Sequence, residues 1–199
     1  MTPLADLDLV LASTSRYRRE LLTRLTPGFR CVAPQVDETA GADESPAALA
    51  ARLAQAKARA VVATNPGALV LGSDQVADLD GRVFGKPGTV EAAQAQLRAC
   101  AGRDVLFHTA ICLIDARVTP WRAHAAQDTT RVRMRALDAA EIERYVAREQ
   151  PLDCAGSFKS EALGIALFER IETLDPSALV GLPLIAVCRL LRECGIGVI

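Results

Sequence analysis

The chain has 199 residues, of which 50% are hydrophobic and 24% are charged, and its formal net charge is −1. This length and apolar content suit one compact domain with a sizeable core, so we predict a single domain over residues 1–199. The small net charge, without any block of like charges, argues against a nucleic acid duplex or an anionic membrane as the partner.

Targeting and metal-binding signals are missing from the sequence. The N-terminus lacks the basic, apolar and small-residue order of a signal peptide, and no apolar run reaches the roughly 18 residues of a membrane span. We therefore expect a cytoplasmic protein. Six cysteines are scattered without the spacing of a zinc site, so we predict buried free thiols.

The start of the chain predicts a strand, a polar turn and a helix. The apolar run at residues 7–12 is typical of a strand buried on both faces. Residues 13–15 form a Ser-Thr-Ser turn, and residues 16–25 then switch to helical spacing. A loop that feeds a helix N-terminus is suited to bind an anion, because unpaired N–H groups point out of it.

Strands and helices continue to alternate in the middle of the chain. Residues 29–36 predict a strand that leads into an acidic loop, and Ser45-Pro46 is a strong start signal for a long helix. Residues 68–71 predict a third buried strand, which runs into the polar residues Gly72-Ser73-Asp74-Gln75. Asp80-Gly81, with apolar residues on both sides, predicts a hairpin.

The second half of the chain predicts two longer antiparallel strands, near residues 105–114 and 129–135. Alternation of polar and apolar residues in the second of them indicates one solvent-facing side. The fold class is therefore α/β, with a central twisted mixed β-sheet flanked by helices and a cleft at the carboxyl ends of the strands. The other predicted elements are helices at 90–101, 138–148 and 183–193, a glycine-containing loop at 154–158 and a strand at 165–170.

Basic residues follow the first predicted turn. Arg18 lies on the core-facing side of the helix, at the mouth of the anion site, and Arg19 lies about 100° further around the helix. Together with the hydroxyl of Ser13, two guanidinium groups could approach one polyphosphate. A serine cap followed by solvated arginines is the competing interpretation.

Acidic residues follow two other predicted strands. Glu38 and Asp74 each lie at the carboxyl end of a strand, where open α/β sheets bind their ligands. Two carboxylates near a triphosphate suit Mg²⁺ or Mn²⁺, since these ions prefer oxygen ligands and bridge phosphate oxygens. Two turn acids without a metal are the alternative.

Lysine is scarce, because 20 of the 23 basic residues are arginine. This scarcity favours phosphate binding for Lys57, in the long helix, and for Lys86, in a Gly-Lys-Pro turn. Solvated surface lysines are the alternative. Lys86 does not belong to a P-loop, because the GxxxxGK[ST] pattern is absent.

Six sequence blocks are spread over nearly the whole chain: LASTSRYRRELL, VDE, LAQAKA, GSDQV, GKP and CAGSFKSEALGIALFERIETLDPSALVGLPL. In this order they resemble the Maf family of nucleoside triphosphate pyrophosphatases, and CAGSFKSE is similar to the 7-methyl-GTP pyrophosphatase branch. The resemblance implies a Maf/ITPase-like fold and a house-cleaning enzyme. Such an enzyme hydrolyses a nucleoside triphosphate between the α and β phosphates with a divalent metal cation.

The resemblance also implies roles for individual residues. Asp74 matches the family's proton acceptor, and with Glu38 it matches the metal ligands. This chain has Arg16 where the family often has Pro, and Tyr17 where the branch often has Trp. The remaining matches are Ser13, Arg18, Arg19, Lys57 and Lys86 around the phosphates, and Tyr17, Gln75 and Glu161 at positions linked to substrate choice.

These roles agree with the chemistry of the side chains. The carboxylate of Glu161 can accept hydrogen bonds from N1–H and N2–H₂ of guanine, and Tyr17 can stack on a cationic N7-methylated base. A free aspartate is a weak base, with a pKa of ~3.9, so Asp74 would deprotonate a water that a divalent ion makes more acidic. We also expect Ser157 and Lys159 to contact the ligand, with a role only in shaping the loop that carries Glu161 as the alternative. A solvent-facing Glu161 and a Tyr17 packed in the core are the alternatives.

Two other functions stay open at this point. One is a nucleotide-binding regulator of cell division or septum formation without significant turnover, and the other is a nucleotide-sugar or phosphatase-type enzyme on a similar sheet. In each case the expected partner is a small-molecule nucleotide. A homodimer also stays open.

Overall fold

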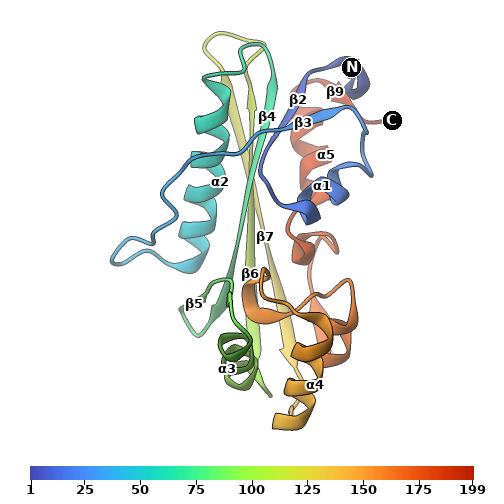
Figure 1. The fold of residues 1–199 in the computed structure, drawn as a ribbon. Helices are drawn as coiled ribbons and strands as arrows, with labels where there is room; N and C mark the ends of the chain where they lie inside the picture. The colour runs from blue at the N-terminus through green and yellow to red at the C-terminus, as the bar shows by residue number, and fades with distance from the viewer.

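The structure is a computed structural model that describes all 199 residues, and its centre is a seven-stranded mixed sheet (Figure 1). The strands of this sheet are β2 (Leu9–Ala12), β3 (Phe29–Cys31), β4 (Leu69–Leu79), β5 (Arg82–Phe84), β6 (Asp104–Asp115), β7 (Arg122–Met134) and β8 (Phe168–Glu172). They are ordered β3-β2-β4-β6-β7-β8, and β5 pairs with β4. The fold class predicted from the sequence, a single α/β domain with a mixed sheet, is confirmed.

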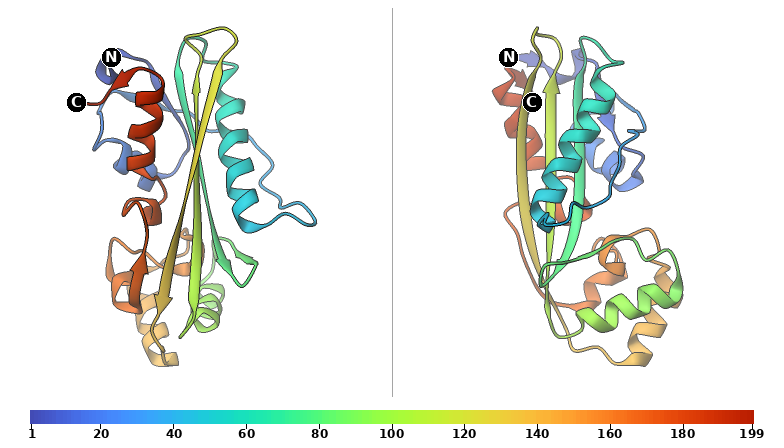
Figure 2. Two further views of the ribbon diagram at one scale, coloured as in Figure 1. Left: turned by 180° about the vertical axis from the view of Figure 1, so that it is seen from behind. Right: turned by 90° about the vertical axis from the view of Figure 1, so that its left-hand side faces the viewer.

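Helices cover both faces of the sheet and one of its ends. They are α1 (Arg16–Leu22), α2 (Pro46–Val62), α3 (Val90–Cys100), α4 (Ala139–Glu149) and α5 (Leu184–Glu193). Helix α2 lies on one face, α1 and α5 lie on the other, and α3 and α4 pack together at the far end (Figure 2). The chain termini meet in a small parallel pair of strands, β1 (Thr2–Pro3) and β9 (Ile196–Gly197).

Strand β4 is much longer than the sequence predicts. Strand β2 runs parallel to it only as far as Ala12, which pairs with Gly72. Strand β6 pairs antiparallel with β4 well beyond that point, for example at Asp74 opposite Ala110. The strand predicted over 68–71 therefore ends too early, because the polar residues at 72–75 stay in the ladder with β6. Asp74 lies inside a strand, just beyond the carboxyl end of its parallel neighbour β2.

Helix α2 approaches β4 unusually closely. Its start is as predicted, since Ser45 caps it and the Ser45 hydroxyl accepts a hydrogen bond from the backbone N–H of Ala48. Gly72 faces the helix, and a Cβ atom placed there would lie 2.3 Å from the carbonyl oxygen of Ala54. A glycine is required at this contact because the obstructing atoms belong to the helix backbone. The contact fixes how far the side chains of α2 reach over the sheet.

Two predicted strands have different boundaries in the structure. The strand expected over 29–36 ends at Cys31, because its partner β2 ends at Ala12. The strand expected over 165–170 begins only at Phe168, opposite Met134 of β7, and residues Leu163–Leu167 form a 3₁₀ helix. The apolar pattern in this segment does not mark one buried strand, because Leu167 is buried whereas Ile165 is exposed.

The apolar core is divided into separate clusters. One cluster, around Phe107 and Phe158, joins the far ends of the sheet strands to α3 and α4. Gly156 lies next to it with φ 74°, and a Cβ there would lie 2.9 Å from Cζ of Phe107. The other clusters join β2, β4 and β6 to α1 and α5 on one face and to α2 on the other. The end of the sheet next to α3 and α4 therefore packs on one apolar cluster, and the end next to α1, α2 and α5 packs on the others.

All six cysteines are free thiols, but only two are buried as expected. Burial raises the pKa of Cys100 to about 12 and that of Cys112 to about 11. Cys31 is exposed because it lies on the short edge strand β3, and the other three are partly exposed. The prediction that all six thiols are buried is therefore wrong for four of them.

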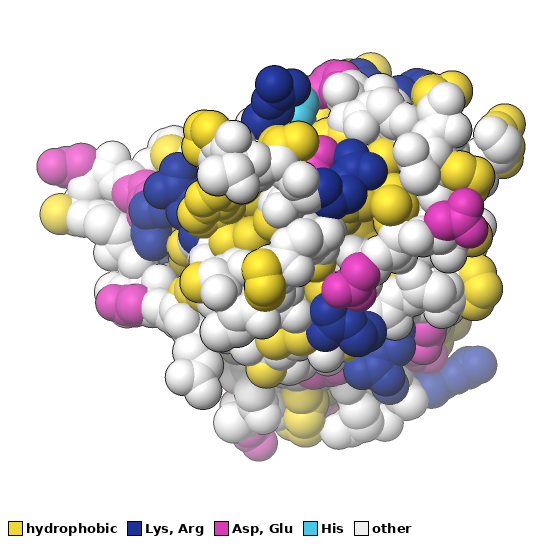
Figure 3. Space-filling model, turned by 90° about the horizontal axis from the view of Figure 1, so that it is seen from above, with side chains coloured by type: hydrophobic (Ala, Val, Ile, Leu, Met, Phe, Trp, Pro, Cys, Tyr) yellow, Lys and Arg dark blue, Asp and Glu magenta, His cyan; other side chains and the backbone are white.

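The surface carries charges of both signs. Positive and negative side chains lie beside one another on the face seen from above in Figure 3, interspersed with apolar ones. None of the five α-helices is long and apolar enough to cross a membrane.

Candidate active site

A cavity of about 650 Å³ opens where the β2–α1 turn, α2, β4, β5 and the loop before β8 come together, and 28 residues line it. Ligand pockets commonly have volumes of roughly 300–1,000 Å³, so this cavity has the size of a small-molecule binding site. The lining includes every predicted site residue except Arg19: Ser13, Tyr17, Arg18, Glu38, Lys57, Asp74, Gln75, Lys86 and Glu161.

Arg19 is exposed and lies outside this lining. A step of one residue along a helix rotates the side chain by about 100°, which turns Arg19 away when Arg18 faces the cavity. The expected pair of guanidinium groups from Arg18 and Arg19 is therefore not brought together. Arg16 contributes to the lining instead.

Lys57, Glu38 and Asp74 form the charged centre of the cavity. The Nζ atom of Lys57 lies 2.6 Å from Oε1 of Glu38 and 2.6 Å from Oδ1 of Asp74. The side chains of Lys57 and Asp74 are only 8% and 10% exposed, whereas that of Glu38 is 61% exposed. Because an unpaired buried charge is strongly unfavourable, the lysine and the aspartate stabilise each other.

Two elements of the fold position this centre. Asp74 and Gly72 lie on the same face of β4, because alternate residues of a strand share a face. Gly72 allows α2 to approach that face, and Lys57 extends from α2 to Asp74. Lys57 lies on the buried side of the helix.

The two carboxylates are suited to a divalent cation that arrives with a nucleotide. Glu38 and Asp74 both contact Nζ of Lys57, and both offer the oxygen ligands that Mg²⁺ and Mn²⁺ prefer. No cluster of three or more His, Cys, Asp or Glu residues could hold a metal by itself. Mg²⁺ sites often use one or two carboxylates and complete their coordination with phosphate oxygens and water, so this donor set fits.

Ser13 and Arg18 form a second polar group beside the charged centre. The hydroxyl of Ser13 is buried and accepts hydrogen bonds from the backbone N–H of Ser15 (3.1 Å) and from Nη1 of Arg18 (3.5 Å). Burial lowers the pKa of Arg18, and the negative charges of Asp74 and Glu38 oppose that shift. An arginine remains protonated in proteins, so Arg18 offers a fixed positive charge to the cavity.

The segment before α5 supports this polar group, and sequence reasoning missed it. Nε of Arg18 donates a hydrogen bond of 2.9 Å to the carbonyl oxygen of Gly181, and the hydroxyl of Ser73 donates to the same oxygen. Gln75 Nε2 donates to the carbonyl oxygens of Ala178 and Leu179. The amide nitrogen of Gln75 is thus used in hydrogen bonds within the protein. The amide oxygen, Oε1, is the atom that remains available to a ligand.

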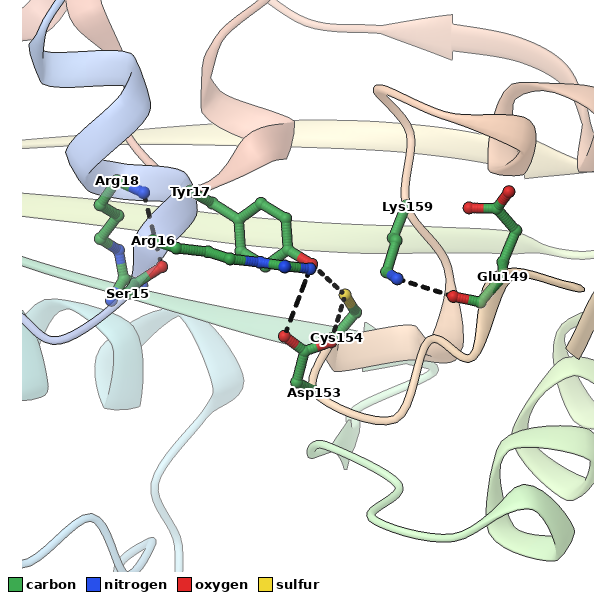
Figure 4. Close-up of polar contacts among 8 residues, drawn as sticks. All are labelled: Ser15, Arg16, Tyr17, Arg18, Glu149, Asp153, Cys154 and Lys159. Atoms are coloured by element: carbon green, nitrogen blue, oxygen red, sulfur yellow. Dashed lines mark hydrogen bonds and ion pairs between the residues drawn. The ribbon is translucent and has the colours of Figure 1, made fainter.

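Four residues at the other end of the cavity contact one another (Figure 4). Arg16 Nη2 donates a hydrogen bond of 2.7 Å to Oη of Tyr17, and Cζ of Arg16 lies 4.7 Å from the centre of the Tyr17 ring. The Tyr17 hydroxyl also lies 3.5 Å from Oδ2 of Asp153 and 3.5 Å from Sγ of Cys154. Burial raises the pKa of Tyr17, so its hydroxyl stays protonated and can donate.

Glu161 is exposed at this end of the cavity, where its carboxylate accepts a hydrogen bond from Ser160. Neither Ser157 nor Lys159 is among the residues that line the cavity, so their expected ligand contacts remain a prediction without support from this geometry. The Ser157 hydroxyl donates to the side chain of Gln96, and Lys159 donates to the carbonyl oxygen of Glu149 (Figure 4). Both residues shape the loop that carries Glu161.

Comparison with known proteins shows which proteins this chain is similar to. A family model described as "Maf-like protein" matches residues 8–194. The chain is 60% identical over 187 residues to a "7-methyl-GTP pyrophosphatase" of Xanthomonas oryzae pv. oryzae, covering 94% of this chain and 96% of that protein. A protein of the same name from Burkholderia thailandensis is 56% identical over 190 residues, covering 94% and 87%. Among solved structures, the Ham1 protein of Staphylococcus aureus aligns with a TM-score of 0.46 at 18% identity, covering 79% and 89%.

Proposed function

Because the chain belongs to the Maf family, we propose that it hydrolyses 7-methyl-GTP between the α and β phosphates and releases 7-methyl-GMP and pyrophosphate. The observation that carries this proposal is the convergence of Lys57, Glu38 and Asp74 inside a cavity of nucleotide size. The names of the relatives support the choice of substrate. The role is that of a house-cleaning enzyme that removes a modified nucleotide.

Positively charged side chains would bind the triphosphate and the departing pyrophosphate. Arg18, Lys57 and Lys86 line the cavity, and Lys86 forms no ion pair within the protein. Fixed cations stabilise negative charge that develops in a transition state, because they need no reorganisation when the reaction occurs. The hydroxyl of Ser13 adds a hydrogen-bonding group beside Arg18.

Asp74 is the proposed proton acceptor. Its Oδ1 atom is bonded to Lys57, whereas Oδ2 has no hydrogen-bond partner in the protein and can face a water molecule. The water oxygen forms a bond to the α-phosphorus as its proton passes to Asp74, and the bond from the α-phosphorus to the bridging oxygen breaks. Pyrophosphate then leaves with the electron pair of that bond.

The proposal includes Mg²⁺ or Mn²⁺ held by Glu38 and Asp74. When bound, a divalent ion supplies charge to offset the phosphates and increases the acidity of water. Lys57 keeps the two carboxylates together at one point of the cavity.

Glu161 is proposed to read the guanine edge, which leads to a test of substrate choice. Replacement Glu161→Gln leaves one acceptor and introduces a donor opposite the N1–H and N2–H₂ groups. We expect kcat/KM for 7-methyl-GTP to fall by about 5- to 160-fold, since a bidentate base contact contributes roughly 1–3 kcal/mol. The value for a pyrimidine triphosphate should change by less than about twofold.

Steady-state kinetics on both substrates would measure this effect, with Glu20→Gln as an exposed control outside the cavity. An equal loss on both triphosphates would show that Glu161 does not discriminate between bases.

Pyrophosphate release from a panel of canonical and modified triphosphates, with and without Mg²⁺ or Mn²⁺, tests the function as a whole. We expect 7-methyl-GTP to be the preferred substrate and the divalent ion to be required. Nucleotide binding without any product would favour the regulator of cell division or septum formation. Release of orthophosphate in place of pyrophosphate would favour a phosphatase-type enzyme.

A further inference from the structure

The end of the cavity that contains Tyr17 and Glu161, here called the base end, is already occupied by a positive charge of the protein, the guanidinium of Arg16. The guanidinium of Arg16 lies over the ring of Tyr17, at 4.7 Å from its centre, and Nη2 of Arg16 lies 3.9 Å from Oδ2 of Asp153. Asp153 also accepts hydrogen bonds from the hydroxyl of Tyr17 and from the thiol of Cys154, each at 3.5 Å. The aromatic ring of Tyr17 and the carboxylate of Asp153 therefore both lie next to the planar, positively charged guanidinium of Arg16.

This arrangement has the chemistry of a site for a cationic ring. A guanidinium and an N7-methylated purine are both planar and spread one positive charge over several atoms. Aromatic faces attract such cations, and a carboxylate beside the ring supplies the opposite charge. All four residues line the cavity, so a bound base can reach the position that Arg16 occupies.

Arg16 is held loosely in this position. Its side chain is 61% exposed and that of Asp153 is 54% exposed, and ion pairs between such exposed groups are weak. A ligand that offers the same charge with a larger ring can therefore displace it. Arg18, by contrast, is anchored to the backbone at Gly181 and stays with the phosphates.

We propose that Asp153 and Arg16 set the preference of this site for a positively charged base. Asp153 is the counterion of the base, and Arg16 is an internal competitor that fills the cation position until the nucleotide displaces it. The identification of the base as 7-methylguanine rests on the proposed function. The charge preference itself rests on the geometry of Arg16, Tyr17 and Asp153.

The two residues have opposite expected effects, which gives a sharp test. The probes are 7-methyl-GMP and its 7-deaza analogue, in which carbon replaces N7 so that the methyl group stays and the ring is neutral. Isothermal titration calorimetry of the full chain measures both dissociation constants without any turnover. The wild-type protein should bind the charged nucleotide more tightly than the neutral one.

Replacement Asp153→Asn should weaken binding of 7-methyl-GMP by about two- to fivefold, as is usual for partly exposed charge pairs. Binding of the neutral analogue should not change. Replacement Arg16→Met removes the competing charge but keeps an unbranched side chain, so it should strengthen binding of 7-methyl-GMP more than binding of the analogue. The matched controls, Asp43→Asn and Arg24→Met, alter exposed charges outside the cavity and should change neither constant.

A purely structural role, in which Arg16 and Asp153 only tie the loop to α1, gives a different result. Both variants would then weaken binding of both nucleotides in the same direction, and that outcome would overturn the inference. Failure of the proposed function is recognised separately. If the wild-type protein releases no pyrophosphate, the proposed enzymatic function is wrong. If the two variants still change the binding of 7-methyl-GMP in opposite directions, the inferred cation site is retained.

Discussion

Replacement Asp74→Asn should lower kcat for 7-methyl-GTP hydrolysis by at least about 100-fold, because a positioned general base commonly contributes about 10²–10⁴ to the rate. The amide has nearly the size of the carboxylate, and its oxygen can still accept the hydrogen bond from Lys57. Lys57 also keeps its ion pair with Glu38, so the fold should remain intact while the proton acceptor is lost. Pyrophosphate release under saturating substrate measures kcat directly.

The control for this experiment is Asp6→Asn, which changes an exposed aspartate outside the cavity. Circular dichroism and thermal unfolding of both variants would show that the fold is kept. If Asp74→Asn retains kcat within a few-fold of the parent, Asp74 is not the base, and the reaction must use another acceptor.

Replacement Gly72→Ala should destabilise the protein by at least about 2 kcal/mol, since overpacking of a well-packed contact usually costs about 1–3 kcal/mol and occasionally more. The added methyl group would lie 2.3 Å from the carbonyl oxygen of Ala54 and 2.7 Å from the backbone nitrogen of Ala58. A helix backbone cannot yield as a flexible side chain can, so α2 must move away from β4. That movement also separates Lys57 from Asp74, and activity should fall with stability.

Urea unfolding measures the loss, and Gly28→Ala is the matched control. A Cβ at Gly28 would meet only the hydroxyl of Thr26, at 3.7 Å, which is an ordinary contact. A Gly72→Ala protein with a free energy of unfolding within about 0.5 kcal/mol of the parent would contradict the close packing of α2 on β4.

Helix starts could be predicted from the sequence because their signals are local. Ser45 with Pro46 marks the start of α2, and Asp138 with Glu141 forms the reciprocal cap of α4. The extent of β4 could not be predicted in this way. Its polar residues from Ser73 onward interrupt the apolar run, and only pairing with β6, more than 30 residues later, keeps them in a strand.

The candidate site shows the same division. Ser13, Asp74 and Lys57 belong to recognisable blocks near predicted element ends, and all of them line the cavity. The group that accepts the hydrogen bond from Arg18 is the backbone oxygen of Gly181, and a backbone contact of this kind cannot be predicted from a residue pattern. Asp153 lies more than 130 residues from Arg16 in the sequence, so their contact depends on the tertiary fold.

The separate cores beneath the two ends of the cavity have an evolutionary consequence. The phosphate end rests on the clusters around β2, β4 and α2, whereas the base end rests on the cluster around Phe107 and Phe158. Substitutions in the second cluster can shift the loop that carries Asp153 and Glu161 without moving Asp74 or Lys57. Descendants of one ancestral hydrolase could therefore diverge in the nucleotide they remove while they inherit the chemical step unchanged.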